Sequence, residues 1–265
     1  TGLIGKWHLG DQPASHPNAQ GFDEFFGFLW GETGYYTHTK EVSGVEELDF
    51  HQNGTTSDIK GYTSDLYSSK AISFLRQSQS HPFFLCLSYN APHYYLDAPQ
   101  EYQNMFSGAS GTKMYAGVMK SLDDSVGRVL TELERLGLDK NTLVVFTTDN
   151  GAPQGEGSNA PFSGFKNSLM EGGIRSPLMA RLPGVIPRGL RCGANFAAWD
   201  LLPTTLSFAG LTASAAVEGA DRKAQFTTQG ATNSDPLCFR YTMTGKLSRA
   251  VVKEHWKLFY DEVTG

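Results

Sequence analysis

The spacing of apolar residues and the residues typical of helix ends predict three helices along the chain. In the longest, apolar side chains recur at intervals of three and four, and Gly137 follows. Another opens with hydroxyl residues and Asp65, as helix starts often do. The shortest begins at Asp200, a favourable N-cap residue, and ends at Gly210. The predicted helices cover residues 63–76, 113–136 and 200–210.

Short continuous apolar runs alternate with these helices and predict buried strands. Residues 81–89 and 142–148 each form such a run, which is typical of a strand covered on both faces. Residues 177–183 are a further strand candidate. Helices alternating with buried strands indicate an α/β sheet whose site lies beyond the carboxyl ends of the strands.

The pattern changes towards the end of the chain, where β-rich segments follow one another closely and predict an antiparallel meander. We therefore place a soft boundary near residue 215, with an α/β core over residues 1–215 and a small antiparallel β subdomain over residues 216–265. Residues 10–62 have little periodicity and are expected to be long surface loops around short elements. The meander segments are residues 237–243, 246–252 and 255–260.

Composition narrows the function classes. The 265 residues are 40% hydrophobic and 18% charged, as in a folded globular protein. The longest apolar run, Phe83–Leu87, is far shorter than the roughly 20 residues of a membrane span. A net charge of −5 offers no basic surface for nucleic acid, and the three cysteines have no spacing of a disulfide framework or zinc site.

Asp149 and Asn150 follow a predicted strand and are the first candidate chemistry. Their oxygens suit Ca²⁺ or Mg²⁺ at the strand end, although Asp-Asn-Gly is also an ordinary turn sequence. A calcium ion takes about 6–8 oxygens, and no nearby acidic cluster supplies the others. Any metal here would need ligands from elsewhere.

Two lysines and two histidines form the second candidate group. Lys6 and His8 alternate along a segment expected to be extended, so we expect them to share one face. His93 follows a predicted strand, and Lys166 lies in a glycine-rich loop. Together these side chains could hold a tetrahedral oxyanion such as sulfate or phosphate, whereas each alone could be structural or solvated.

Several common motifs are absent from the sequence. It has no phosphate-binding G-x-x-x-x-G-K-[ST], no strand-linked G-x-G-x-x-G, no H-E-x-x-H and no G-x-S-x-G. The aromatic residues of Phe22–Phe28 fit core packing better than a sugar-stacking platform.

Six blocks of the sequence resemble type I sulfatases in the order of that family. The block Gly5-Lys-Trp-His-Leu-Gly10 resembles the second sulfatase signature, and residues 157–162 resemble the arylsulfatase A and N-acetylgalactosamine-6-sulfatase branch. The other blocks are Gly21–Gly27, Asn90–His93, Thr148–Gly151, Lys166 with Glu171–Gly173, and Asp200–Thr204.

This resemblance implies an alkaline-phosphatase-like mixed sheet flanked by helices, with a small C-terminal antiparallel β domain. It implies that Asp149 and Asn150 are calcium ligands. Lys6 and His8 would lie beside the nucleophile, with His8 assisting release of sulfate from the covalent intermediate. His93 and Lys166 would contact the sulfate ester.

One departure from the family matters. Sulfatases use a formylglycine made from Cys or Ser in a C/S-x-P-x-R motif, and neither this motif nor the N-terminal aspartate pair of the family is present. We therefore expect the chain to be an inactive section of a longer sulfatase that acts on sulfated sugars. The alternatives are a phosphoesterase or phosphonate hydrolase of the same superfamily and a non-catalytic binder of sulfated glycans.

The resemblance also implies partners and a compartment. A formylglycine-generating or sulfatase-maturing enzyme would modify the parent protein. The parent would be periplasmic or extracellular, or lysosomal in a eukaryote. We expect no membrane or nucleic-acid partner.

Overall fold

The computed structural model describes residues 1–243 and 245–262, which form two compact units, Thr1–Leu138 and Asp139–Gly265. The predicted boundary near residue 215 falls inside the second unit and stays a prediction. The last three residues of the predicted β subdomain, 263–265, lie outside the described part. Within the described part, no helix is long and apolar enough to cross a membrane.

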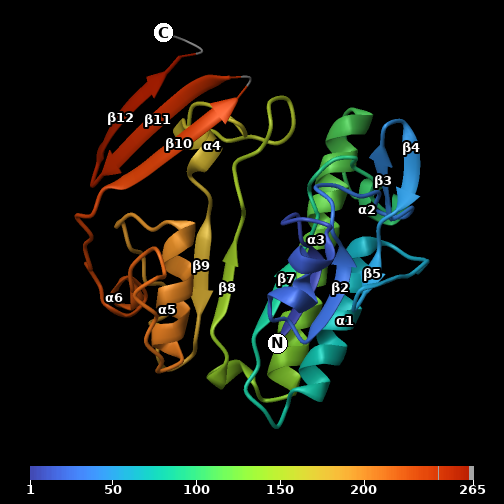
Figure 1. The fold of residues 1–265 in the computed structure, drawn as a ribbon, viewed down its shortest axis with the longest axis horizontal. Coiled ribbons are helices and arrows are strands. Elements are labelled where there is room, and N and C mark those ends of the chain that lie inside the picture. Colours follow the sequence, from blue (N-terminus) through green and yellow to red (C-terminus); the bar gives the residue numbers. More distant parts are fainter. Residues whose placement is uncertain (244, 263–265) are drawn as a thin grey trace. The chain divides into compact units, whose positions relative to one another are not determined.

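The first unit is built on a sheet with three parallel strands, in which β1 lies between β2 and β7. Figure 1 labels β2 and β7 of this sheet. Two short antiparallel strands extend the sheet beside β2, giving the order β6-β5-β2-β1-β7. The strands are β1 (Gly2–Lys6), β2 (Glu24–Phe28), β5 (His51–Gln52), β6 (Thr55–Thr56) and β7 (Leu85–Ser88), with a separate hairpin of β3 (Thr39–Val42) and β4 (Val45–Leu48).

Glycines allow the parallel strands to approach closely. A Cβ at Gly5, which has φ +114°, would lie 2.0 Å from the carbonyl oxygen of Ser88.

The core of this unit is aromatic, with Phe28, Phe50 and Tyr67 fully buried. The helices of this unit are α1 (Thr63–Gln77), α2 (Gln100–Gln103) and α3 (Ser110–Arg135).

The second unit contains a two-stranded sheet, three short helices and an antiparallel meander. Strand β8 pairs with β9 in antiparallel register, and β11 pairs with β10 and β12. The elements are β8 (Val144–Thr147), α4 (Glu171–Ile174), β9 (Leu178–Arg181), α5 (Leu201–Phe208), α6 (Lys223–Thr227), β10 (Leu237–Met243), β11 (Lys246–Lys253) and β12 (Trp256–Asp261).

Most predicted elements are confirmed, with ends that shift by a few residues. The three helices, the meander and the parallel strand β7 occur as predicted. The expectation of a buried strand at residues 142–148 is wrong, because Phe146 is 36% exposed and β9 is the one pairing partner of β8 among the described residues. Asp200 occupies the N-cap position of α5, but its carboxylate bonds the Ala197 and Ala220 amides instead of capping.

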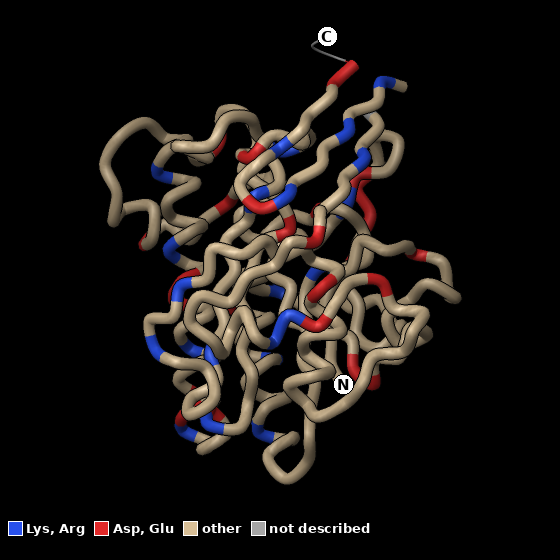
Figure 2. Tube along the Cα trace, turned by 90° about the vertical axis from the view of Figure 1, so that its left-hand side faces the viewer, with Lys and Arg blue, Asp and Glu red and all other residues tan. Residues whose placement is uncertain are grey.

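Charged residues of both signs are scattered along the trace (Figure 2). This distribution agrees with the small net charge of −5. The backbone trace thus gives no sign of a large surface of one charge.

Candidate functional site

The first group of candidate residues follows two neighbouring parallel strands. Lys6 ends β1 and His8 comes two residues later, while His93 follows β7. The Ser88 hydroxyl, at the end of β7, donates to the carbonyl oxygen of Lys6 at 2.6 Å. Because the carboxyl ends of parallel strands meet at one edge of a sheet, the loops after β1 and β7 leave the sheet at the same edge.

His8 is held through its backbone by the segment that follows β2. The Trp7 amide donates to the Phe28 carbonyl oxygen at 3.0 Å, and the His8 amide donates to that of Leu29 at 3.1 Å. His8 has φ +59°, so the extended geometry does not continue through it. The premise that alternation places Lys6 and His8 on one face is therefore wrong at this position.

Trp7, between them, is a packing residue. Its ring contacts that of Phe22 edge to face at 6.2 Å between centroids, and its indole N–H donates to the Ser15 carbonyl oxygen at 2.9 Å. This anchor fixes the backbone on which Lys6 and His8 are carried.

His93 is fixed by bonds to its backbone and to its ring. Its amide donates to the Asn90 carbonyl oxygen at 2.7 Å, and its own carbonyl oxygen accepts from the hydroxyl of the buried Tyr35 at 2.9 Å. Nδ1 lies 2.8 Å from the carbonyl oxygen of Tyr94. A carbonyl oxygen can only accept, so Nδ1 carries the proton in this contact and Nε2 is the basic nitrogen of the neutral ring.

Asp149 and Asn150 form a turn directly after β8. Oδ1 of Asp149 accepts from the Asn150 amide at 2.9 Å, and Nδ2 of Asn150 donates to the Gly151 carbonyl oxygen at 2.9 Å. These bonds are typical of a strand-ending turn. The turn carries two groups with hard oxygen atoms, the exposed carboxylate of Asp149 and the side-chain amide of Asn150. Among residues 1–243 and 245–262, no group of three or more His, Cys, Asp or Glu side chains is placed to hold a metal.

The donor chemistry of this pair fits part of a calcium site. Two residues cannot complete a set of about 6–8 oxygens, as the sequence already indicated. This turn can therefore contribute part of a calcium site, and the other ligands would have to come from other segments.

Lys166 lies in a loop bonded to the same turn. Its amide donates to the carbonyl oxygen of Ala152 at 3.0 Å, and the Gly151 amide donates to that of Gly173 at 3.0 Å. A Cβ at Gly151 would lie 1.7 Å from the Gly172 carbonyl oxygen, so the turn and the start of α4 are in direct backbone contact. Asp149, Asn150 and Lys166 thus belong to one loop assembly of the second unit.

Asn159 holds this loop assembly together. Its Oδ1 accepts from the Ala152 amide at 2.8 Å, and its Nδ2 donates to the carbonyl oxygens of Ala152 at 2.9 Å and Gly164 at 3.2 Å. The sequence does not reveal this role, although Asn159 lies in the block 157–162 that carries the branch resemblance. Nothing in the sequence indicates the role of Tyr35, whose hydroxyl holds the backbone of His93.

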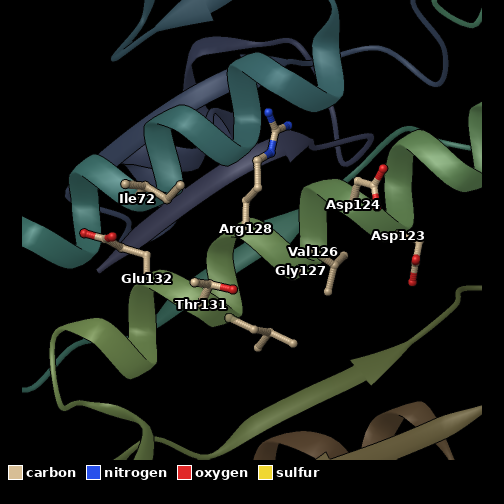
Figure 3. A pocket seen from close by; sticks show the side chains of 9 residues that line it. Ile72, Asp123, Asp124, Val126, Gly127, Arg128, Thr131 and Glu132 are labelled. Atoms are coloured by element: carbon tan, nitrogen blue, oxygen red, sulfur yellow. The ribbon is translucent and has the colours of Figure 1, made fainter. Parts of the chain in front are cut away.

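A surface hollow along α3 is not a candidate site. Ile72 of α1 and a row of α3 side chains line it (Figure 3). Its charged groups are already paired. Arg128 pairs with Asp65 and Glu132 with Arg76, while Asp123 and Asp124 both pair with Lys120. None of the six candidate residues lines it.

Comparisons with known proteins agree with the six sequence blocks. The model of the Sulfatase family matches residues 1–211. N-acetylgalactosamine-6-sulfatase of Mus musculus is 36% identical over 226 residues, which is 79% of this chain and 42% of the relative. The chain thus spans about two fifths of that relative's length.

Two solved structures resemble the fold. Ps i-CgsB, solved in complex with k-i-k-neocarrahexaose, is 32% identical with a TM-score of 0.91, over 98% of this chain and 62% of that one. A protein solved with its substrate D-glucosamine-2-N,6-O-disulfate is 20% identical with a TM-score of 0.75, over 98% of this chain and 70% of that one. These likenesses confirm the predicted α/β fold class.

Proposed function

Because this chain belongs to the sulfatase family, we propose that the whole protein hydrolyses sulfate esters of saccharides. The saccharide is proposed from the relatives, since one is named for N-acetylgalactosamine 6-sulfate and another was solved with an oligosaccharide. The observation that carries the proposal is the fixed placement of Lys6, His8 and His93 after parallel strands that meet at one sheet edge.

The lysines bind the substrate in this proposal. A sulfate ester carries one negative charge spread over its oxygens, and ammonium groups stabilise that charge as it moves during reaction. Lys6 and Lys166 supply two such groups. Lys166 is held by the loop assembly around Asn159, which limits the reorganisation needed when substrate binds.

The histidines handle protons. The Tyr94 carbonyl oxygen holds the Nδ1 proton of His93, so His93 Nε2 is suited to bonding with the bridging oxygen of the ester and, once protonated, to donating its proton as the alcohol leaves. His8 lies two residues after β1, and we assign it proton transfer at the nucleophile and during release of sulfate.

Asp149 and Asn150 are proposed as ligands of a calcium ion, whose remaining ligands come from segments outside this chain. A formylglycine hydrate beside this ion would supply the nucleophile that attacks sulfur. The 265-residue chain alone is then inactive, and a maturation enzyme must modify the parent protein. We place the parent in the periplasm or outside the cell, or in the lysosome of a eukaryote.

The proposal is tested in the mature whole protein with an aryl sulfate substrate. We expect His93→Ala and Lys166→Ala each to lower kcat/KM at least about 100-fold, as for the loss of a proton donor or a charge-stabilising group. His81→Ala and Lys60→Ala are matched controls, because both side chains are exposed, and they should leave kcat/KM within about twofold. Near-normal turnover in either site variant removes that residue from the mechanism, and activity in the 265-residue chain alone contradicts the proposal.

A further inference from the structure

A buried carboxylate lies beneath the segment that holds His8. Asp49 is 1% exposed and follows β4. Its Oδ2 accepts from the Trp30 amide at 2.8 Å, and its Oδ1 accepts from the Leu29 amide at 3.3 Å. Its Oδ1 also lies 2.8 Å from Nε2 of His51, which carries the donated proton. A burial this deep is rare for an aspartate unless such partners compensate it.

The bonds of Asp49 stabilise its charged form. Burial alone raises the pKa of Asp49. The hydrogen bonds from His51 and from the Trp30 and Leu29 amides together lower it by more than burial raises it, so the pKa is below its ordinary value. The carboxylate is therefore ionised at neutral pH. Charge-assisted bonds of this kind are about twice as strong as neutral ones and orient the groups that they join.

The two amides that Asp49 binds belong to the segment on which His8 rests. The Leu29 carbonyl oxygen accepts from the His8 amide at 3.1 Å. One residue beyond Trp30, a Cβ added at Gly31 would lie 2.7 Å from Nε2 of His8, so the bare Cα of Gly31 is packed against the imidazole. The segment of residues 29–31 is thus fixed by Asp49 on one side and supports His8 on the other.

We propose that Asp49 is the positioning residue for His8, acting through the backbone of residues 29–31. His51 completes the device by holding one oxygen of Asp49. Three hydrogen bonds join the Asp49 carboxylate to these two amides and to His51, and none of the three closes a pairing within the parallel sheet. The effect of this positioning on catalysis rests on the proposed function, while its effect on the conformation of His8 does not.

The first test measures the conformation of His8 in the 265-residue chain by nuclear magnetic resonance. In Asp49→Asn, one oxygen is replaced by an NH₂ group that cannot accept, so we expect the Leu29 and Trp30 amide signals to shift upfield. The imidazole signals of His8 should shift or split, while those of His93 stay in place. Asp58→Asn is the matched control, because Asp58 is exposed and pairs with Lys60. Unchanged His8 signals in a folded Asp49→Asn protein overturn the proposal.

A second variant covers the case in which Asp49→Asn does not fold. His51→Phe keeps a ring of similar size but removes the donor to Asp49, so the two amide bonds persist with a less restrained carboxylate. We expect smaller shifts of the same His8 and Trp30 signals. Identical His8 signals in folded His51→Phe and in the unchanged protein also overturn the proposal.

The second test uses the mature whole protein. We expect Asp49→Asn to lower kcat about 10-fold with KM changed less than twofold, because a misplaced proton-transfer group affects the reaction more than binding. A rise in KM alone, or no change in kcat, contradicts positioning of a catalytic His8. If His8→Ala itself leaves kcat unchanged, the proposed role of His8 fails, whereas the resonance test still decides whether Asp49 positions it.

Discussion

The two units hold their candidate residues by different means, the first by a sheet and the second by a loop. Lys6, His8 and His93 follow strands of a parallel sheet whose backbones are in close contact at glycine. In contrast, Asp149 and Lys166 belong to a loop assembly tied by backbone bonds and the amide of Asn159.

This difference predicts how each unit responds to a destabilising substitution. A sheet with helices and a buried aromatic core unfolds cooperatively, so a clash between its strands costs stability of the whole unit. A loop assembly can open by itself, and its loss changes the site while the unit stays folded.

The largest effect is expected from Gly5→Ala in the first unit. The new Cβ would lie 2.0 Å from the Ser88 carbonyl oxygen, at a φ of +114° that favours glycine. We expect the free energy of unfolding of this unit to fall by about 3 kcal/mol, measured by urea denaturation. Gly127→Ala in α3 is the control, since its Cβ meets nothing within 4 Å and alanine favours helix. A loss below about 1 kcal/mol would show that the strands can separate at low cost.

Gly151→Ala tests the loop assembly of the second unit. Its Cβ would lie 1.7 Å from the Gly172 carbonyl oxygen, which forces the turn away from the start of α4. We expect faster amide hydrogen exchange confined to residues 149–173, with a smaller change in global stability than for Gly5→Ala. Gly193→Ala, whose Cβ meets nothing within 4 Å, should leave exchange unchanged. Global unfolding by Gly151→Ala would erase the contrast between the two units.

Asn159→Ala removes the side chain that bonds three backbone groups of the loop. Leaving these groups without partners should lower the local free energy of opening by about 1–3 kcal/mol, measured by the exchange rates of the Ala152 and Lys166 amides. Asn141→Ala, at an exposed position in the same unit, should not change these rates. Equal effects of both variants would mean that Asn159 does not hold the loop.

Residues 1–138 also illustrate what the sequence could predict. The helix over residues 113–136 was predictable because apolar spacing is a local property. Strand β2 was not predicted as a strand, because its residues lie in a glycine- and aromatic-rich segment without periodicity, and its aromatic side chains were expected only to pack in a core. The position of His93 after a parallel strand was predictable, because the apolar run of β7 ends before it, and its role in a site stays a prediction.

The supporting residues of the site could not be predicted in the same way. Asp49 acts on amides about 20 residues away in the chain, and Tyr35 bonds His93 at a separation of 58. Such contacts depend on how elements pack, which neither spacing nor local propensity encodes. The left-handed backbone of His8 was also unpredictable, because it depends on bonds to the segment after β2.

The smallest effect concerns an ion pair between helices of the first unit. Hydrogen bonds from Arg135 and then Arg76 lower the pKa of Glu132 to about 2, from an ordinary value of 4.5. Because the pKa is lower in the folded state, this stabilisation is complete above pH 4.5 and is lost as the pH falls through about 2. We expect Glu132→Gln to flatten the dependence of Tm on pH between 2 and 5. Parallel curves for the two proteins would contradict this assignment.

The central claim is that the candidate lysines and histidines bind a sulfate ester and act in its hydrolysis. Its most direct test is kcat/KM of the mature whole protein for a sulfated sugar and for the same sugar with phosphate in place of sulfate, a tetrahedral oxyanion of higher charge. We expect the sulfate to be hydrolysed at least about 100-fold more efficiently, since a site built for one negative charge leaves the second uncompensated. Preferred hydrolysis of the phosphate would make the protein a phosphoesterase, and binding of the sulfated sugar without turnover would make it a non-catalytic binder; either result would contradict the claim.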